Sequence, residues 1–433
     1  MTNENTWWSD SLDYSTRSDI GMRRTNNQDA ARSVPAASLR LWHKRGHLFI
    51  VADGMGAHAA GELASQMAAD AIPQSYLKGS LESPADALRG AILQAHEKIK
   101  RQGKSDDAFR DMGTTVDVLV LLPEGALVGH VGDSRVYRLR HGAFEQLTFD
   151  HSLVWEVKRS GRIPEDKIPA YIPKNVITRS LGPTENLVVD LEGPYALEVG
   201  DTFLLCSDGL SGQVDDSEMG QILAVFSPEE ATETLVNLAN LRGGPDNVTV
   251  SVARMTAIPD AEPENAVLFP EKRPNISTLA LSFLAMAIAS ILPVFFLFLV
   301  QKNDHQAQLS LAFFLLFSIF FGTFVFLARK TLFTSGRKSL DEQQLGAGPY
   351  VRSSAKPTLA FATRLADLRQ QLAEAVKQQR VAADWEKIRA WEKELPSLTR
   401  AGKVAEVIRA NARIINALMR EIKNQSNKSK NEA

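Results

Sequence analysis

Four short blocks of sequence place an acidic side chain at or beside the end of an apolar strand. The blocks are Arg24–Asp29, Asp53–Gly56, Ser207–Leu210 and Gly244–Asn247. Carboxylate and carbonyl oxygens that are held rigidly are the ligands that magnesium and manganese prefer. Asp-Gly and Pro-Asp-Asn are also ordinary turn signals. Because four acid-bearing turns occur in one stretch of chain, we interpret them as turns that together bind divalent cations.

Regular elements must hold these turns in place. An apolar run precedes Asp53, another precedes Asp208, and an alternating strand follows Asp246. Hydrophobic periodicity predicts helices and strands around them. The predicted strands are 48–52, 115–122, 126–131, 135–139, 203–206 and 248–252, and the predicted helices are 60–76 and 84–101. Hairpins packed face to face with helices outside predict an α+β sandwich.

Residues 15–255 resemble the metal-dependent protein phosphatases of type 2C, the PPM family, in its bacterial branch. The matching motifs, in the order of the family, are Ser18–Gly21 with Asn27–Asp29, Val51–His58 with Gly61–Glu62, Gly113–Thr115, Gly129–Arg135, Leu147–Thr148 with Asp150–Ser152, Ile177–Gly182, Cys206–Leu210 and Gly244–Asn247. The resemblance implies a central β-sandwich flanked by helices. It also implies hydrolysis of phosphoserine and phosphothreonine in proteins, by a catalytic domain at 15–256 that follows a lead-in at 1–14.

The resemblance further implies two divalent cations, manganese or magnesium. Asp53 would bridge both ions, Asp208 and Asp246 would complete the shell of one, and the Gly54 carbonyl would bind the other. Arg24 would bind the phosphate as a forked donor. The implied reaction is direct attack by a metal-bridging hydroxide, with no phosphoenzyme.

Weaker candidates surround this set. Asp29 could act as an acid beside the metal ligands, and Gln28 stands where many family members have glutamate, so it could only hydrogen-bond metal waters. Asp133 matches a ligand of the third metal described in bacterial members, although a strand turn also explains it. His58 could protonate the leaving group or simply cap a helix. Met55 cannot donate a proton, although it lies near the position of a histidine in eukaryotic members.

Two apolar runs, 276–300 and 309–328, contain no charged residue. Each is long enough to span a hydrocarbon core about 30 Å thick, and neither has the polar stripe of a soluble helix. We predict a transmembrane hairpin at 276–328 between linkers at 257–275 and 329–357, with buried core helices as the alternative. The basic residues that flank it are Lys272, Arg273, Arg329, Lys330, Arg337 and Lys338. They predict a multi-pass protein of the cytoplasmic (inner) membrane, with catalytic domain and tail facing the cytoplasm.

Residues 358–433 have the pattern of a helical, coiled-coil-like tail. Apolar periodicity predicts two amphipathic helices, one over the apolar positions from 359 to 395, interrupted at Pro396, and a second over 404–422. Residues 329–433 carry 21 Lys and Arg against 11 Asp and Glu, although the formal net charge of the chain is -2. A basic tail suits anionic lipids, an acidic partner or a solvated helix face. We expect the helices to pack on one another or across a dimer, leaving catalysis independent of the tail, and we expect no nucleic-acid binding.

Several positions have two interpretations. Cys206, the only cysteine, fits an inert buried thiol better than a nucleophile. Residues 150–180 fit either a mobile flap or an ordinary helix and loop. Arg135 and Arg138 fit surface ion pairs. The alternative to catalysis is a membrane-tethered adaptor that binds phosphoproteins, and the intact set of aspartates favours the enzyme.

Overall fold

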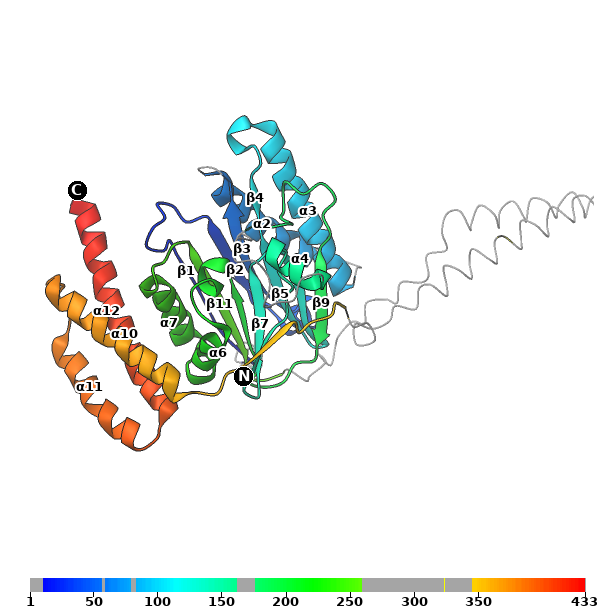
Figure 1. Ribbon diagram of the computed structural model, residues 1–433. Coiled ribbons are helices and arrows are strands. Elements are labelled where there is room, and N and C mark those ends of the chain that lie inside the picture. Colours follow the sequence, from blue (N-terminus) through cyan, green and yellow to red (C-terminus); the bar gives the residue numbers. More distant parts are fainter. Residues whose placement is uncertain are drawn as a thin grey trace, which may run out of the picture. The chain divides into compact units, whose positions relative to one another are not determined.

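The structure is a computed structural model that describes residues 11–56, 59–78, 83–161, 176–258, 323 and 345–432 (Figure 1). Residues 1–260 and 343–433 form one compact unit, and residues 261–342 form a second. Nearly all of the second unit lies outside the described residues. The first unit contains two sheets and the helices that surround them.

Two six-stranded antiparallel sheets form the centre of this unit. The first sheet has the order β1 (Leu12–Asp19), β11 (Val248–Met255), β10 (Thr202–Cys206), β7 (Arg135–Arg140), β8 (Ala143–Gln146) and β12 (Val351–Ser354). The second has the order β2 (Asp29–Val34), β3 (His47–Met55), β5 (Val116–Leu122), β6 (Gly125–Val131) and β9 (Asp190–Tyr195), and β4 (Gly113–Thr114) pairs with β3.

The inner faces of the two sheets share a hydrophobic core. Phe49 and Leu119 from the second sheet belong to the same buried cluster as Val136, Phe203 and Leu205 from the first. Alternate residues of a strand point to opposite faces, so each strand gives every second side chain to this core. The predicted α+β sandwich is therefore confirmed.

Helices cover the outer face of each sheet (Figure 1). On the second sheet lie α2 (Ala60–Lys78) and α3 (Pro84–Ser105), and on the first lie α6 (Asp216–Val225) and α7 (Pro228–Leu241). Helix α7 begins with a capping box in which Ser227 and Glu230 satisfy each other's backbone amides. Shorter helices are α1 (Leu39–Arg45), the 3-10 turn Asp107–Phe109, α4 (Leu153–Ser160) and α5 (Asp208–Ser211). Of the region at 150–180, the described part contains α4 and an extended return from residue 176.

The tail forms three helices, α10 (Leu359–Gln378), α11 (Trp385–Arg400) and α12 (Val404–Glu432). The predicted first helix is therefore two helices, with the break between residues 378 and 385. Pro396 lies inside α11, which continues to Arg400, so the predicted interruption at Pro396 is wrong. Helices α10 and α11 pack on α12, as expected for a helical tail. Their buried side chains, however, form one hydrophobic cluster with α6, α7 and the outer face of the first sheet. The tail thus covers the catalytic domain instead of packing only on itself.

The predicted linker at 329–357 also differs from the structure. Within it, β12 pairs with β8 in the register Val351↔Gln146 to Ser354↔Ala143 and so becomes the edge of the first sheet. Tyr350 and Gly348 continue this contact by donating hydrogen bonds to Glu192. The chain therefore rejoins the sandwich at residue 345, before the tail helices begin.

Among the helices that the structure describes, none is long and apolar enough to cross a membrane. The predicted spans 276–300 and 309–328 lie outside the described residues, apart from Thr323. The transmembrane hairpin and its orientation therefore stay predictions from the sequence.

Candidate active site

Asp53 lies near the carboxyl end of β3, between β2 and β5. Every side chain from Leu48 to Ala52 is fully buried, so close packing holds this end of the strand rigidly. Thr115 fixes the backbone of Asp53, because its Oγ1 accepts from Asp53 N at 2.9 Å and its N donates to Asp53 O at 2.8 Å. At Gly54 a Cβ atom would collide with two backbone carbonyls of neighbouring segments. The backbone that presents Asp53 and the Gly54 carbonyl is thus tightly constrained.

Asp29 and Asp208 lie beside Asp53. Asp29 is the direct partner of Asp53 across β2 and β3, and its Oδ2 accepts from Ser207 Oγ at 2.8 Å. Asp208 begins α5 just after β10, and its charge is one of those that raise the pKa of Asp53. Buried carboxylates that interact in this way repel one another, so a proton or a cation stabilises the group.

Asp246 and Arg24 approach the cluster from two loops. Asp246 lies between α7 and β11, and its Oδ2 accepts from Arg24 Nη2 at 2.7 Å. We call residues 20–28 the Arg24 loop. Asn247 clamps this loop: its Nδ2 donates to the carbonyl oxygens of Ile20 and Asn26 at 2.9 and 3.0 Å, and its Oδ1 accepts from the backbone amide of residue 28 at 2.8 Å. The sequence pattern predicted Asn247 only as part of a turn and did not indicate its contacts with the Arg24 loop.

The electrostatics of the cluster follow from burial and mutual repulsion. Burial and the charges of Asp29 and Asp208 raise the pKa of Asp53 well above its usual range. Burial raises the pKa of Asp29 to about 7, although hydrogen bonds from two hydroxyl groups oppose it. Burial and the charge of Asp246 also raise the pKa of Asp208. Crowded carboxyl groups of this kind are stabilised by nearby positive charge, as at a cation site.

The weaker candidates lie in different places. Asp133, in the turn between β6 and β7, is buried, and burial and the charge of Asp208 raise its pKa to about 7. It therefore interacts electrostatically with the main cluster. The Gln28 side chain donates a long hydrogen bond of 3.4 Å to the Gly56 carbonyl. His58 lies outside the described residues.

The donor set fits hard cations. Three buried carboxylate oxygens, the Oδ1 atoms of Asp29, Asp133 and Asp208, have no hydrogen-bond partner in the described part of the chain. Such acceptors are costly unless a donor or a cation satisfies them. No three His, Cys, Asp or Glu side chains among the described residues are already arranged around one point for a metal. One oxygen of Asp246 accepts a hydrogen bond from Arg24, so this carboxylate does not complete such an arrangement.

Arg135 is a site residue that sequence reasoning placed wrongly. Its side chain is 20% exposed, and its guanidinium donates to both oxygens of the buried Asp150 at 2.7–3.1 Å, instead of forming a surface pair. Its charge favours the ionised form of Asp208, and it lies over the ring of Trp155 in α4. The pairing of a strand arginine with an acid fifteen positions later has no signature in the sequence pattern. Arg138 likewise binds a buried acid, Glu145.

Comparison with known proteins agrees with the geometry. The family model described as "Protein phosphatase 2C" matches residues 22–161. Protein phosphatase PhpP of Streptococcus pneumoniae serotype 2 is 36% identical over 248 residues, which cover 56% of this chain and 98% of PhpP. The chain belongs to the protein phosphatase 2C family. The serine/threonine phosphatase stp of Listeria welshimeri is 37% identical over 209 residues, 47% of this chain and 82% of that protein.

Two solved structures of serine/threonine phosphatases are also similar to this chain. The serine/threonine phosphatase of S. agalactiae is 33% identical and covers 56% of this chain and 99% of its own, with a TM-score of 0.51. The Mycobacterium tuberculosis phosphatase PstP/Ppp is 32% identical and covers 57% and 99%, with a TM-score of 0.50. The predicted enzyme class, a protein serine/threonine phosphatase, is confirmed. Phosphatases of this family use divalent metals.

Proposed function

We propose that this phosphatase is a membrane-anchored, metal-dependent enzyme that hydrolyses phosphoserine and phosphothreonine in proteins by direct attack of hydroxide, without a phosphoenzyme. Its catalytic domain would comprise residues 15–256. The observation that carries the proposal is the group of buried aspartates, with unpaired oxygens, where β2 begins and β3 and β10 end. Burying several carboxylates together lowers the stability of the fold unless cations offset their charge.

Four residues would hold two divalent cations, manganese or magnesium. Asp53 would contribute to both, Asp208 and Asp246 to one, and the Gly54 carbonyl to the other. Bound cations would lower the pKa of a water molecule and offset charge on the phosphoryl oxygens. A third cation at Asp133 remains a prediction, as does a proton-transfer role for His58.

Arg24 would bind the phosphoryl group. Its side chain is 47% exposed, and Asp246 is the partner of one of its nitrogens. A phosphate monoester presents several oxygens to a planar fork of N–H donors, so substrate could take up the donors that Asp246 leaves free. Arg24 would then connect the phosphate with a ligand of the cations.

Anchoring rests on the sequence of residues 276–328. The two uncharged runs and their basic flanks favour a hairpin with both ends in the cytoplasm. The substrates would then be phosphoproteins at the inner face of the membrane.

The experiment is Asp53→Asn in the detergent-solubilised full chain. Manganese-dependent hydrolysis of p-nitrophenyl phosphate should fall by at least about 100-fold, because a charge shared by two cations is removed. Without metal, the melting temperature should equal or exceed that of the wild type, since one of the crowded carboxylates becomes neutral. The rise in melting temperature that manganese gives the wild type should be lost.

The matched control is Asp70→Asn, which removes an exposed carboxylate that pairs with Arg32 on the surface. It should keep both turnover and the manganese effect. Near wild-type hydrolysis by a folded Asp53→Asn protein would refute the two-cation site.

A further inference from the structure

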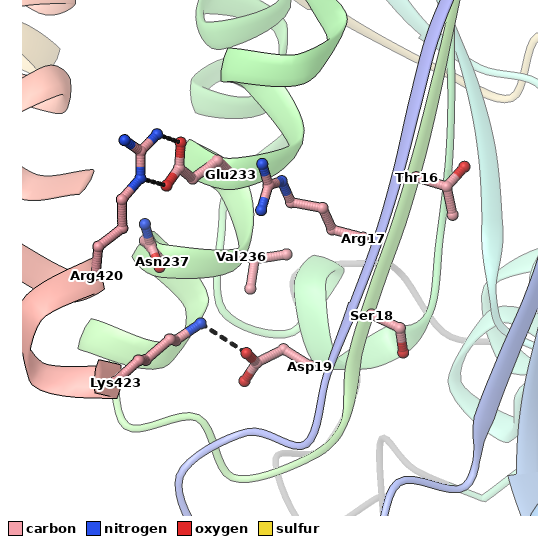
Figure 2. Close-up of a pocket in the computed structure, with 9 residues that line it drawn as sticks. All are labelled: Thr16, Arg17, Ser18, Asp19, Glu233, Val236, Asn237, Arg420 and Lys423. Carbon is pink, nitrogen blue, oxygen red and sulfur yellow. Dashed lines mark hydrogen bonds and ion pairs between the residues drawn. The ribbon is translucent and has the colours of Figure 1, made fainter. Parts of the chain in front are cut away.

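The last tail helix contacts the catalytic domain at the root of the Arg24 loop. Lys423 Nζ on α12 lies 2.6 Å from Asp19 Oδ2, and 404 positions separate the two residues in the chain. Asp19 is the last residue of β1, directly before residues 20–28. Figure 2 shows the lysine reaching from α12 to Asp19 across the lower rim of a cavity.

The other oxygen of Asp19 organises the beginning of the loop. Asp19 Oδ1 accepts from the backbone N of Gly21 at 3.0 Å and from Asn240 Nδ2 on α7 at 2.9 Å. One residue further, Met22 N donates to the Gly244 carbonyl at 2.8 Å. Asp19 therefore ties the first turn of the loop to α7, close to the segment that carries Asp246.

Residues of α12, β1 and α7 line a cavity of about 340 Å³ at this point. Its rim carries two ion pairs from α12, Lys423 with Asp19 and Arg420 with Glu233 (Figure 2). Glu233 belongs to α7, whereas Asp19 belongs to the loop root. The two ion pairs are therefore neighbours on α12, but Lys423 binds the root of the Arg24 loop and Arg420 binds α7.

The ion pair between Lys423 and Asp19 is short and partly shielded from solvent. The Asp19 side chain is 20% exposed and that of Lys423 is 41% exposed, so solvent screens the pair only in part. Without the ammonium, Asp19 Oδ2 would lose its partner, and the carboxylate would gain freedom to turn away from Gly21. The start of the Arg24 loop would then be held less firmly.

We propose that Lys423 is a positioning residue of the phosphatase: it fixes Asp19 and, through Asp19, the loop that carries Arg24 and Gln28. The catalytic part of this inference rests on the proposed role of Arg24. The link between Lys423 and the loop stands on the contacts alone. The tail is then part of the machinery that shapes the phosphate-binding loop.

The test compares Lys423→Met, Lys423→Arg and Arg420→Met in the detergent-solubilised full chain. Hydrogen exchange of a peptide covering residues 20–28, measured without metal, should be several-fold faster in Lys423→Met than in the wild type. Lys423→Arg should restore protection, because an arginine can also reach Asp19. Arg420→Met removes an ion pair of the same helix and should leave loop exchange unchanged.

Kinetics give a second readout. Lys423→Met should raise the KM for p-nitrophenyl phosphate by about two- to fivefold, with a smaller change in kcat, and Arg420→Met should not. Equal loop exchange in Lys423→Met and Arg420→Met would overturn the proposal, since Lys423 would then only attach the helix. Faster exchange without a change in KM would overturn the assigned role of Arg24 and leave the link to the loop intact.

Discussion

Removing one buried amide should loosen the tail from the catalytic domain. Asn416 of α12 lies against α7, where its Oδ1 accepts from Asn237 Nδ2 and its Nδ2 donates to Thr234 Oγ1, both at 2.9 Å. All three side chains are buried. The change Asn416→Ala removes both hydrogen bonds and leaves the Asn237 amide without that acceptor in a place where water has little access.

The size of the effect can be worked from these contacts. A hydrogen bond between neutral groups contributes about 1 kcal/mol net, and a buried donor left unpaired costs about 1–3 kcal/mol. We therefore expect the free energy of unfolding to fall by about 2–3 kcal/mol. For a unit of this size that corresponds to a decrease in melting temperature of roughly 5 °C.

Asn411 provides a matched control on the same helix. It is equally buried, but its Nδ2 donates only to the Val407 carbonyl of its own helix, and its Oδ1 has no partner among the described residues. Asn411→Ala should change stability by less than about 1 kcal/mol, because alanine favours helix and an unsatisfied acceptor disappears.

Urea unfolding of the full chain in detergent, followed by tryptophan fluorescence and by circular dichroism, measures both variants. Trp385 and Trp391 of α11 belong to the margin of the shared core, and Trp42 and Trp155 lie in the catalytic domain, so fluorescence reports on both parts of the chain. Equal losses in the two variants, or no loss for Asn416→Ala, would refute the view that these hydrogen bonds hold the tail in place.

Two further predictions concern pH and topology. Burial lowers the pKa of His47 to about 4, so the folded protein favours its neutral form. The stability that His47 contributes is fully present above pH 6.5 and is lost as the pH falls towards 4, by about 1.4 kcal/mol per pH unit. His47→Asn should therefore make the dependence of stability on pH shallower by up to about 1.4 kcal/mol per unit in urea titrations between pH 6.5 and 4.5, and an unchanged slope would contradict the assignment. Reporters fused after Met255 and at Ala433 should both read cytoplasmic, while a cysteine at Asn303 should react with a reagent outside intact cells; labelling of the C-terminus from outside would overturn the hairpin.

The turns and the elements beside them can be predicted from the sequence because their cause is local. An apolar run is buried, and an aspartate followed by glycine favours a turn. The pattern therefore predicts Asp53 and Asp208 near strand ends. Helix α2 begins at Ala60, as the periodicity predicts. Asp29 and Asp53 are neighbours because β2 pairs with β3, which strand patterns favour but do not fix in register.

The remaining features depend on contacts between distant segments. Strand β12 is four residues long and mostly exposed, so it has neither apolar alternation nor length to reveal it. The apolar stripe of α12 indicates that something covers it, but not that α7 does. Asn416 interrupts that stripe, and its purpose appears only beside Asn237. Likewise, Lys423 is an ordinary basic residue until Asp19 is placed against it.

The return of the chain to the first sheet at residue 345 has a consequence for biosynthesis. The edge strand β12 and the helices that cover α6 and α7 are translated after residues 261–342, so the first sheet is completed only after residue 354 has left the ribosome, and its helices are covered only after α12 has done so. At about 5–20 residues per second, synthesis of residues 345–432 takes roughly 4–18 s. During that interval the face that receives α12 is open to water and to chaperones. A ribosome that stalls after the predicted membrane segment would therefore hold a phosphatase domain with an uncovered apolar face.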